Sequence, residues 1–219
     1  MNLSTLTALT ASMAQDPAQT RYSNYTQALN LAQQQFALDS KCLWKDWPTT
    51  TITSGLAAYA LPADFMWEKT VMFNGIELTP ISRHELQVIK TGDRWDDDTG
   101  TPTRYIVDPD VAKSQLLLYP IPQAVDAGKD LVLTYYGLPT DMAAGSDIPF
   151  NATLLLAQFH IGIAAWAAWI LLQSEQVTPE IERKKKDLLQ IYNDNVSLAV
   201  DKFKNTASEL MRMRGNRAT

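Results

Sequence analysis

The chain has 219 residues, of which 46% are hydrophobic and 20% charged, so its length and composition suit one large globular domain or two small ones. This excludes a disordered, collagen-like or disulfide-rich protein, and the single cysteine, Cys42, cannot form an internal disulfide. The net charge is −5, and residues 180–219 carry nine basic against six acidic side chains, so the acidic surplus lies elsewhere. Such a chain lacks the clustered basic face of a nucleic-acid-binding protein.

The N-terminal part is predicted to be helical. Its first residues, MNLSTLTALTASMAQ, lack the basic start and apolar block of a signal peptide, so we expect a cytoplasmic location. Residues 3–14 suit a short helix. Asp16 as N-cap and Pro17 at the first helical position then predict an amphipathic helix of roughly 25 residues. Pro48 ends this helical part.

The middle of the chain, residues 48–140, is predicted to be a small antiparallel β-sandwich or barrel. Six short runs have strand composition and are bounded by turn residues: TTTITS, AAYALP, TVMFNG, RYIVD, QLLLYP and DLVLTYYG. Asn74-Gly75 is a hairpin turn sequence. Ser82 and Glu85 form the capping-box pattern of one short helix.

Residues 151–175 are expected to form an apolar helix around the run LLLAQFHIGIAAWAAWILL. This run reaches only the minimum length of a bilayer span, contains Gln158 and His160, and lacks basic flanks, so we expect burial within protein. A helix that is apolar on all sides has more surface than one small subunit can cover. We therefore expect an obligate oligomer, with the interface candidates Phe159, Trp166, Trp169 and Ile170.

A long helix is predicted after Thr178, the N-cap, and Pro179. Its apolar stripe, Leu189, Tyr192, Val196, Ala199, Phe203, Ala207 and Leu210, has helical spacing throughout. At 1.5 Å per residue the helix would be roughly 50 Å long, so its end should project from a small domain. The expected fold class is thus α+β: helices of residues 1–47 and 141–219 form a bundle, and residues 48–140 form an inserted β domain.

Sequence motifs for catalysis, metal binding and cofactor binding are lacking, so we predict a non-enzymatic protein with no metal or cofactor. The two histidines and one cysteine lie far apart, and neither a nucleophile elbow nor a phosphate-binding loop occurs. His160, among apolar neighbours, suits a core or interface residue with a satisfied ring. Cys42 suits a small buried side chain. The Asp96–Asp98 run is the one candidate cation site, although a solvated loop explains it as well.

The order of short motifs resembles the head-to-tail adaptor proteins of short-tailed bacteriophages. The resembling segments run from YTQALNLAQQQFALDSKCLW through YALPADFMWEKTVMFNGIELTPISRHEL to GTPTRYIVD, LLLYPIP and LVLTYYGLPTDM, followed by an apolar helix and a long charged helix. The most distinctive part is the pattern G-x-P-x-x-Y, L-x-L-Y-P-x-P and L-x-Y-Y. The similarity covers roughly residues 17–214.

This resemblance implies a structural virion protein that forms a ring, expected to hold twelve copies, between the portal and the tail. The ring would contact the portal and the tail nozzle or other tail proteins, and genomic DNA would pass through it without sequence-specific binding. Assembly in the host cytoplasm and a final place at the head–tail junction follow. The resemblance makes the C-terminal helix the portal-docking element, with the candidates Leu189, Tyr192, Val196, Phe203, Leu210, Met211, Arg212 and Arg214.

Two other functions remain open from the sequence. Trp95, in the loop DRWDDD, is compatible with a β-sandwich module that binds a glycan or peptide on a helical stalk. The aspartates of the same loop are compatible with a cation-dependent hydrolase.

Overall fold

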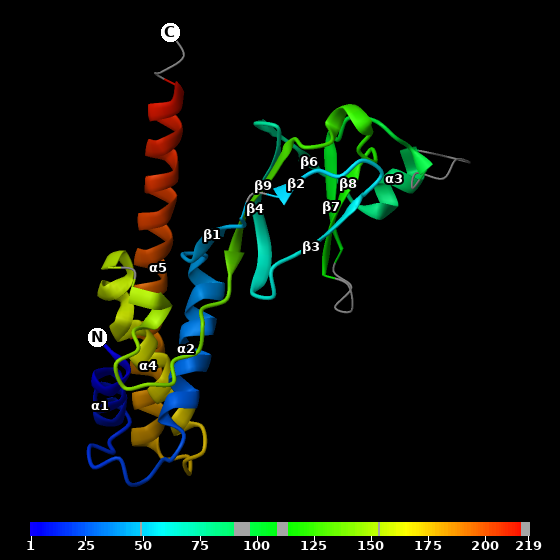
Figure 1. The fold of residues 1–219 in the computed structure, drawn as a ribbon. Coiled ribbons are helices and arrows are strands. Elements are labelled where there is room, and N and C mark those ends of the chain that lie inside the picture. Colours follow the sequence, from blue (N-terminus) through cyan, green and yellow to red (C-terminus); the bar gives the residue numbers. More distant parts are fainter. Residues whose placement is uncertain (49, 90–96, 109–113, 153, 216–219) are drawn as a thin grey trace. The chain divides into compact units, whose positions relative to one another are not determined.

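The computed structural model describes residues 1–219 except 49, 90–96, 109–113, 153 and 216–219, and gives only the backbone of residues 89, 151, 152, 154–156 and 204–215. It divides into two compact units, each with its own hydrophobic core (Figure 1). Unit 1 comprises residues 1–43 and 138–219, and unit 2 comprises residues 44–137. The predicted α+β fold class with a long C-terminal helix is confirmed. The roles expected of the two parts stay predictions.

Unit 1 is helical. It contains α1 (Leu3–Met13), α2 (Tyr25–Ser40), α4 (His160–Leu172) and α5 (Pro179–Gly215), with the 3-10 turns η3 (Pro149–Ala152) and η4 (Leu154–Phe159) before α4. Helix α4 contacts α1, α2 and α5, and Figure 1 shows it lying among them. The core of unit 1 therefore forms around α4, where Leu6, Leu29, Phe36 and Ile163 are fully buried.

The predicted helix start at Asp16-Pro17 is wrong. The chain forms α1, then a loop, and α2 begins only at Tyr25. The Asp16 carboxylate accepts hydrogen bonds from the backbone N–H groups of Thr20 and Arg21, at 3.1 and 2.9 Å. The side chain that would cap a helix thus organises a loop, because short carboxylates satisfy backbone donors in turns as readily as at helix starts.

Of the two C-terminal helices, α4 begins later than the sequence predicted, and α5 begins at the predicted residue. The expected helix over residues 151–175 is shorter, because the first part of that segment forms η3 and η4 and α4 begins only at His160. Helix α5 begins where predicted: Pro179 is its first residue, and the Ile181 N–H donates to Thr178 Oγ1 at 3.3 Å. Its 37 residues correspond to a length of about 55 Å.

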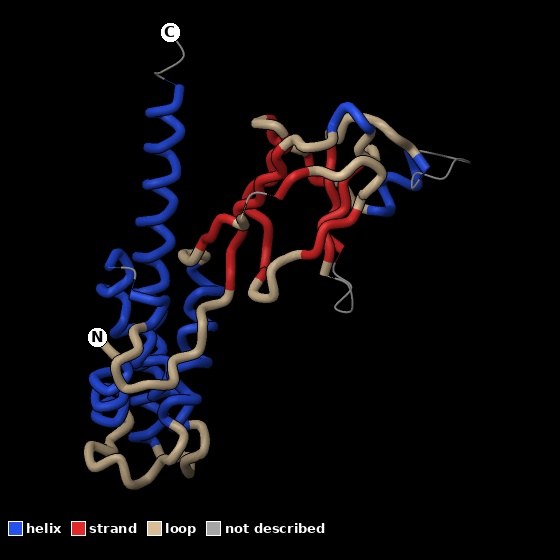
Figure 2. Tube along the Cα trace, viewed as in Figure 1, coloured by secondary structure: helices blue, strands red, loops and turns tan. Residues whose placement is uncertain are grey.

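Unit 2 contains two small sheets (Figure 2). One has the order β1-β9-β4-β5, with β2 also pairing with β9, and the other has the order β3-β8-β7-β6. Most pairs are antiparallel, and β6 pairs with β7 in parallel. The strands are β1 (Trp44–Asp46), β2 (Thr50–Thr51), β3 (Ala58–Ala60), β4 (Phe65–Phe73), β5 (Ile76–Glu77), β6 (Thr79–Pro80), β7 (Arg104–Asp108), β8 (Gln115–Tyr119) and β9 (Asp130–Gly137), with the 3-10 turn η2 (Ala124–Asp126) between β8 and β9.

The core of unit 2 lies between the sheets. In β9, Leu131, Leu133 and Tyr135 are buried, while the alternate residues are partly exposed, as a strand with one face on a core requires. Residues of β7 and β8 in the other sheet, such as Leu116 and Leu118, join the same cluster. The period-two pattern therefore places one face of each sheet against the other.

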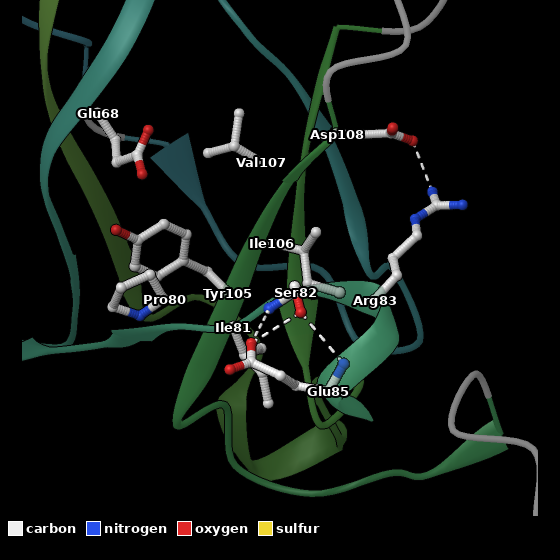
Figure 3. A pocket seen from close by; sticks show the side chains of 10 residues that line it. All are labelled: Glu68, Pro80, Ile81, Ser82, Arg83, Glu85, Tyr105, Ile106, Val107 and Asp108. Atoms are coloured by element: carbon white, nitrogen blue, oxygen red, sulfur yellow. Dashed lines mark hydrogen bonds and ion pairs between the residues drawn. The ribbon is translucent and has the colours of Figure 1, made fainter. Parts of the chain in front are cut away.

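Two local structures predicted in unit 2 are confirmed. Asn74 and Gly75, with φ of 48° and 78°, join β4 to β5 in the left-handed backbone region that this hairpin turn requires. In α3 (Arg83–Ile89), the Glu85 N–H donates to Ser82 Oγ at 3.1 Å, and the Ser82 N–H donates to Glu85 Oε2 at 2.8 Å. Figure 3 shows this reciprocal capping box.

Candidate assembly surfaces

The apolar helix α4 is covered largely by its own chain. Nine of its thirteen residues are buried, and five of those nine are alanine or glycine. Small side chains let the neighbouring helices approach closely, so three helices can enclose α4 within unit 1. Apolar surface remains partly exposed at Trp166, Trp169 and Ile170, and Ile161 is 42% exposed. Within α4, the surplus surface expected from the sequence is therefore limited to these four side chains.

Gly162 marks a close approach of α4 to α5. A Cβ atom at this position would lie 2.7 Å from Asn195 Cβ and 3.3 Å from Phe36 Cε2. The Asn195 Cβ is attached directly to the α5 backbone, so it cannot move away as the end of a flexible side chain would. Glycine is therefore a packing requirement of this helix pair, a role that sequence inspection did not find, since it depends on which helix faces Gly162.

Aromatic side chains line the contact between α4 and α5. Trp166 stacks on Trp169, with ring centroids 4.7 Å apart and planes 16° apart, and the Tyr192 ring lies 4.4 Å from Trp166. The Tyr192 hydroxyl donates to Asp39 Oδ2 at 2.5 Å, which ties α5 to α2. Phe159, another interface candidate, is only 2% exposed and packs on Phe36, so within this chain it presents little surface to a neighbour.

The portal-contact candidates fall into two groups along α5. Leu189, Val196 and Phe203 are partly buried and Tyr192 is buried, with Val196, Phe203 and Tyr192 packing on the core of unit 1. Leu210, Met211, Arg212 and Arg214 lie in the last part of α5, where only the backbone is described. Figure 1 shows this part of α5 extending past the other helices of unit 1.

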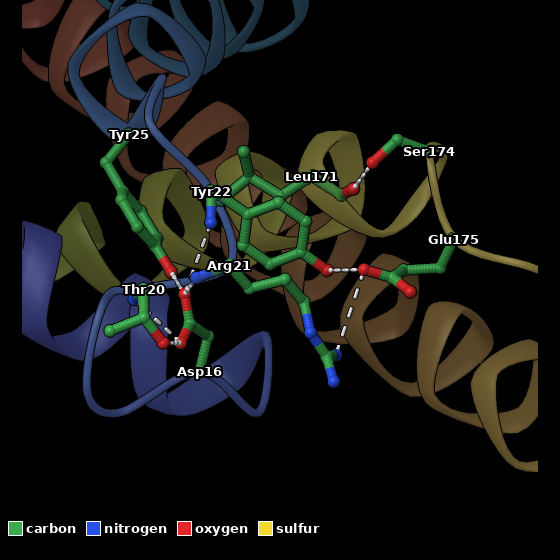
Figure 4. Close-up of polar contacts among 8 residues, drawn as sticks. All are labelled: Asp16, Thr20, Arg21, Tyr22, Tyr25, Leu171, Ser174 and Glu175. Atoms are coloured by element: carbon green, nitrogen blue, oxygen red, sulfur yellow. Dashed lines mark hydrogen bonds and ion pairs between the residues drawn. The ribbon is translucent and has the colours of Figure 1, made fainter.

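A polar cluster holds the α1–α2 loop against the end of α4 (Figure 4). The Asp16 carboxylate accepts a hydrogen bond from the Tyr25 hydroxyl at 2.8 Å, and Glu175 Oε1 accepts one from the Tyr22 hydroxyl at 2.7 Å. Arg21 lies 3.8 Å from Glu175. Burial raises the pKa of Asp16, but the bonds from Tyr25 and the loop backbone outweigh it, so the pKa is lowered overall.

His160 lies at the start of α4 with 1% of its surface exposed, and its Nδ1 is 2.8 Å from the Met1 amino group. Burial is the main reason that the pKa of His160 falls to about 4, and the nearby amino group lowers it further. The ring is therefore neutral near pH 7. It is a buried, hydrogen-bonded histidine, as its apolar neighbours predicted.

The residues that the sequence suggested as ligand-binding, cation-binding or nucleophilic candidates are not gathered in one site where the structure describes them. Trp95 and Asp96 lie outside the described residues. Asp98 accepts a hydrogen bond from the Tyr119 hydroxyl at 2.6 Å. Cys42 is buried, and burial raises the pKa of its thiol to about 11. Among the residues that the structure describes, no three His, Cys, Asp or Glu side chains group as metal ligands would.

A search of the described helices found none with both the length and the apolar character that crossing a bilayer demands. The run LLLAQFHIGIAAWAAWILL, which raised the question, is divided between η4 and the thirteen-residue α4.

The fold defines a two-unit α+β protein, with a β unit inserted between helices and a long terminal helix that outreaches its bundle. The sequence matches the SU10 adaptor protein family over residues 1–216, and the chain belongs to this family. It is therefore a bacteriophage adaptor, a structural protein of the head–tail junction. A comparison with curated proteins found no match.

Proposed function

We propose that this protein is the ring-forming subunit between portal and tail, with twelve copies around a lumen through which genomic DNA passes. Assembly would take place in the host cytoplasm. Membership of the adaptor family over nearly the whole chain supports this function. The observation that carries the portal contact is α5, whose 37 residues continue beyond the other helices of unit 1. A helix that extends past the rest of its bundle can be reached there by a partner.

The portal contact is assigned to the end of α5. Native mass spectrometry of the protein mixed with its cognate portal should show a complex with twelve copies of the 24.5 kDa chain. A chain ending at residue 203 keeps all the described side chains that pack on the unit 1 core, so it should fold and yet fail to bind the portal. Portal binding by the shortened chain at undiminished affinity would contradict the assignment.

Two variants with the same change of charge distinguish the contribution of the end of α5 to portal binding from that of its beginning. Arg212→Glu with Arg214→Glu should weaken portal binding, because both residues lie in the extending part of the helix. Arg183→Glu with Lys186→Glu makes the same charge change at two exposed positions near the helix start, and should leave binding unchanged. Equal losses in both variants would indicate a non-specific charge effect.

The contact between ring subunits is assigned to the exposed edge of α4. Ile170 is partly exposed there, and a buried carboxylate at a subunit contact is costly, so Ile170→Glu should prevent ring formation. Val177→Glu is the matched control, because Val177 is 74% exposed in the connection between α4 and α5. Circular dichroism checks that both variants fold. Rings formed by Ile170→Glu in normal yield would rule out this surface.

A further inference from the structure

Unit 2 contains a cavity at the edge of its two sheets. Its volume is about 580 Å³, within the range of roughly 300–1,000 Å³ that small-ligand pockets occupy. Residues of β4, β6, β7 and α3 line it, together with the short segment that joins β6 to α3. The lining includes the apolar residues Pro80, Ile81, Ile106 and Val107, of which Ile106 and Val107 lie on opposite sides of β7 (Figure 3).

Most polar groups around this cavity already have partners. The Arg83 guanidinium donates to Asp108 Oδ2 at 2.6 Å, and Glu85 Oε2 accepts hydrogen bonds from the Ser82 N–H and hydroxyl groups. Figure 3 shows the Arg83–Asp108 pair at one end of the cavity. These groups are engaged in holding α3 in place, so they offer little to a ligand.

Glu68 and Tyr105 lie at the opposite end, where the Tyr105 hydroxyl and the Glu68 carboxylate face the same space (Figure 3). Tyr105 is only 4% exposed, and neither its hydroxyl nor the Glu68 carboxylate has a hydrogen-bond or ion-pair partner among the described residues. The hydroxyl itself is not one of the fully enclosed polar atoms that lack a partner in the described part of the chain, so it is open to the water in the cavity. The pair therefore offers an accessible hydroxyl and a carboxylate to a group that enters the cavity.

The electrostatics of this end select a cation. Burial raises the pKa of Tyr105 to about 12, and the carboxylates of Glu68 and Glu77 add to the rise, so the hydroxyl stays protonated and neutral near pH 7. No cationic side chain of the described cavity lining faces Glu68, since Arg83 is paired with Asp108 at the far end. An incoming positive charge would be attracted here, and an anion would be repelled.

We propose that this cavity binds the lysine or arginine side chain of a partner protein. Glu68 supplies the counter-charge, the Tyr105 hydroxyl oxygen accepts a hydrogen bond from the cationic group, and the apolar side chain of Val107 contacts the aliphatic stem. Long basic side chains combine an apolar stem with a charged end, which matches this lining. The site lies in unit 2 and is independent of the portal and ring contacts proposed for unit 1.

The test uses the full chain and N-acetyl-arginine methylamide as the probe. Methyl resonances of Ile81 and Val107, which line the cavity, report binding in an NMR titration. The expected result is a saturable shift of these two resonances. N-acetyl-citrulline methylamide has nearly the same shape without the charge and should produce no saturable shift. Equal responses to the two probes, no response to either, or saturable binding of N-acetyl-glutamate methylamide instead would overturn the proposal.

Two conservative variants locate the binding groups. Glu68→Gln removes the charge and should weaken arginine binding about tenfold, since hydrogen bonds to charged groups contribute more than neutral ones. Tyr105→Phe keeps the buried ring and should weaken it about threefold. Glu180→Gln makes the same change as Glu68→Gln at an exposed position of unit 1 and should leave affinity unchanged. Unchanged affinity in Glu68→Gln, with a native methyl spectrum, would refute the site.

Discussion

Gly162 shows how a single residue sets the spacing of two helices. Gly162→Ala should destabilise the protein by about 1–3 kcal/mol, because the added Cβ would meet Asn195 Cβ at 2.7 Å. Helix propensity alone predicts the opposite sign, since alanine favours a helix interior by roughly 1 kcal/mol over glycine. Urea unfolding followed by circular dichroism measures the change.

A double-mutant cycle provides the control for Gly162. Asn195→Gly removes the Cβ that the new methyl group would meet, so adding Gly162→Ala to this variant should be much less harmful than adding it to the natural chain. If the two effects simply add, the steric contact is not the cause.

His160 makes stability depend on pH in a defined window. Burial lowers the pKa of its ring from 6.5 to about 4, so the folded protein binds fewer protons than the unfolded chain between these values. The contribution of the neutral His160 ring to the free energy of unfolding is fully present above pH 6.5. The free energy of unfolding should fall by up to about 3 kcal/mol as the pH drops toward 4. Urea unfolding at a series of pH values between 7 and 4 measures this slope.

The matched variant for this pH dependence is His160→Gln, which cannot titrate in the window. Its slope between pH 6.5 and 4 should be smaller than that of the natural chain. Asp16, whose pKa is lowered below 3.8, loses its contribution only at more acidic pH and so does not confuse the comparison. Identical slopes in the two proteins would show that His160 is not the responsible group.

At the scale of elements, Asp16 organises the connection between α1 and α2. Asp16→Ala leaves the Thr20 and Arg21 N–H groups and the Tyr25 hydroxyl without their acceptor, so thermal stability should fall. Tyr25→Phe removes one of these bonds and should have a smaller effect in the same direction. Differential scanning calorimetry compares the two, and a larger loss in Tyr25→Phe would contradict the role of the carboxylate.

Elements fixed by nearby residues were predictable from the sequence. The start of α5 at Thr178-Pro179, the capping box of α3 and the Asn74-Gly75 hairpin each depend on a few adjacent residues, and all three are present. The Asp16-Pro17 pattern failed although it is equally local. A capping carboxylate serves a loop as well as a helix, and the choice depends on Tyr25 and the rest of the folded unit.

Elements and sites that need a distant partner were not predictable. Strand β1 is three residues long, and it exists because Trp44 pairs with Tyr136, far along the chain. The convergence of Glu68 with Tyr105 likewise depends on how two sheets meet. The helices that pack on α4 were likewise not predictable. Its apolar composition shows that α4 must be buried, but does not show which segments bury it.

At the scale of the whole molecule, the net charge affects whether the protein binds DNA. A chain with a charge of −5 should not bind duplex DNA at physiological salt, since affinity for the backbone comes mainly from clustered lysine and arginine. Fluorescence anisotropy with a labelled duplex tests this on the isolated protein. If the duplex instead bound saturably at micromolar concentration, and the binding weakened with salt, the proposal that DNA passes through the ring without being bound would be contradicted.

The pairing of β1 with β9 has an evolutionary consequence. Trp44 and Tyr136 are cross-strand neighbours, so the chain enters and leaves unit 2 at points about 5 Å apart. A segment with adjacent ends can be excised or exchanged by recombination while the flanking polypeptide needs only a tight turn to reconnect. Unit 2 thus has the geometry of a cassette, in which residues 44–137 can diversify while the helical scaffold is inherited intact.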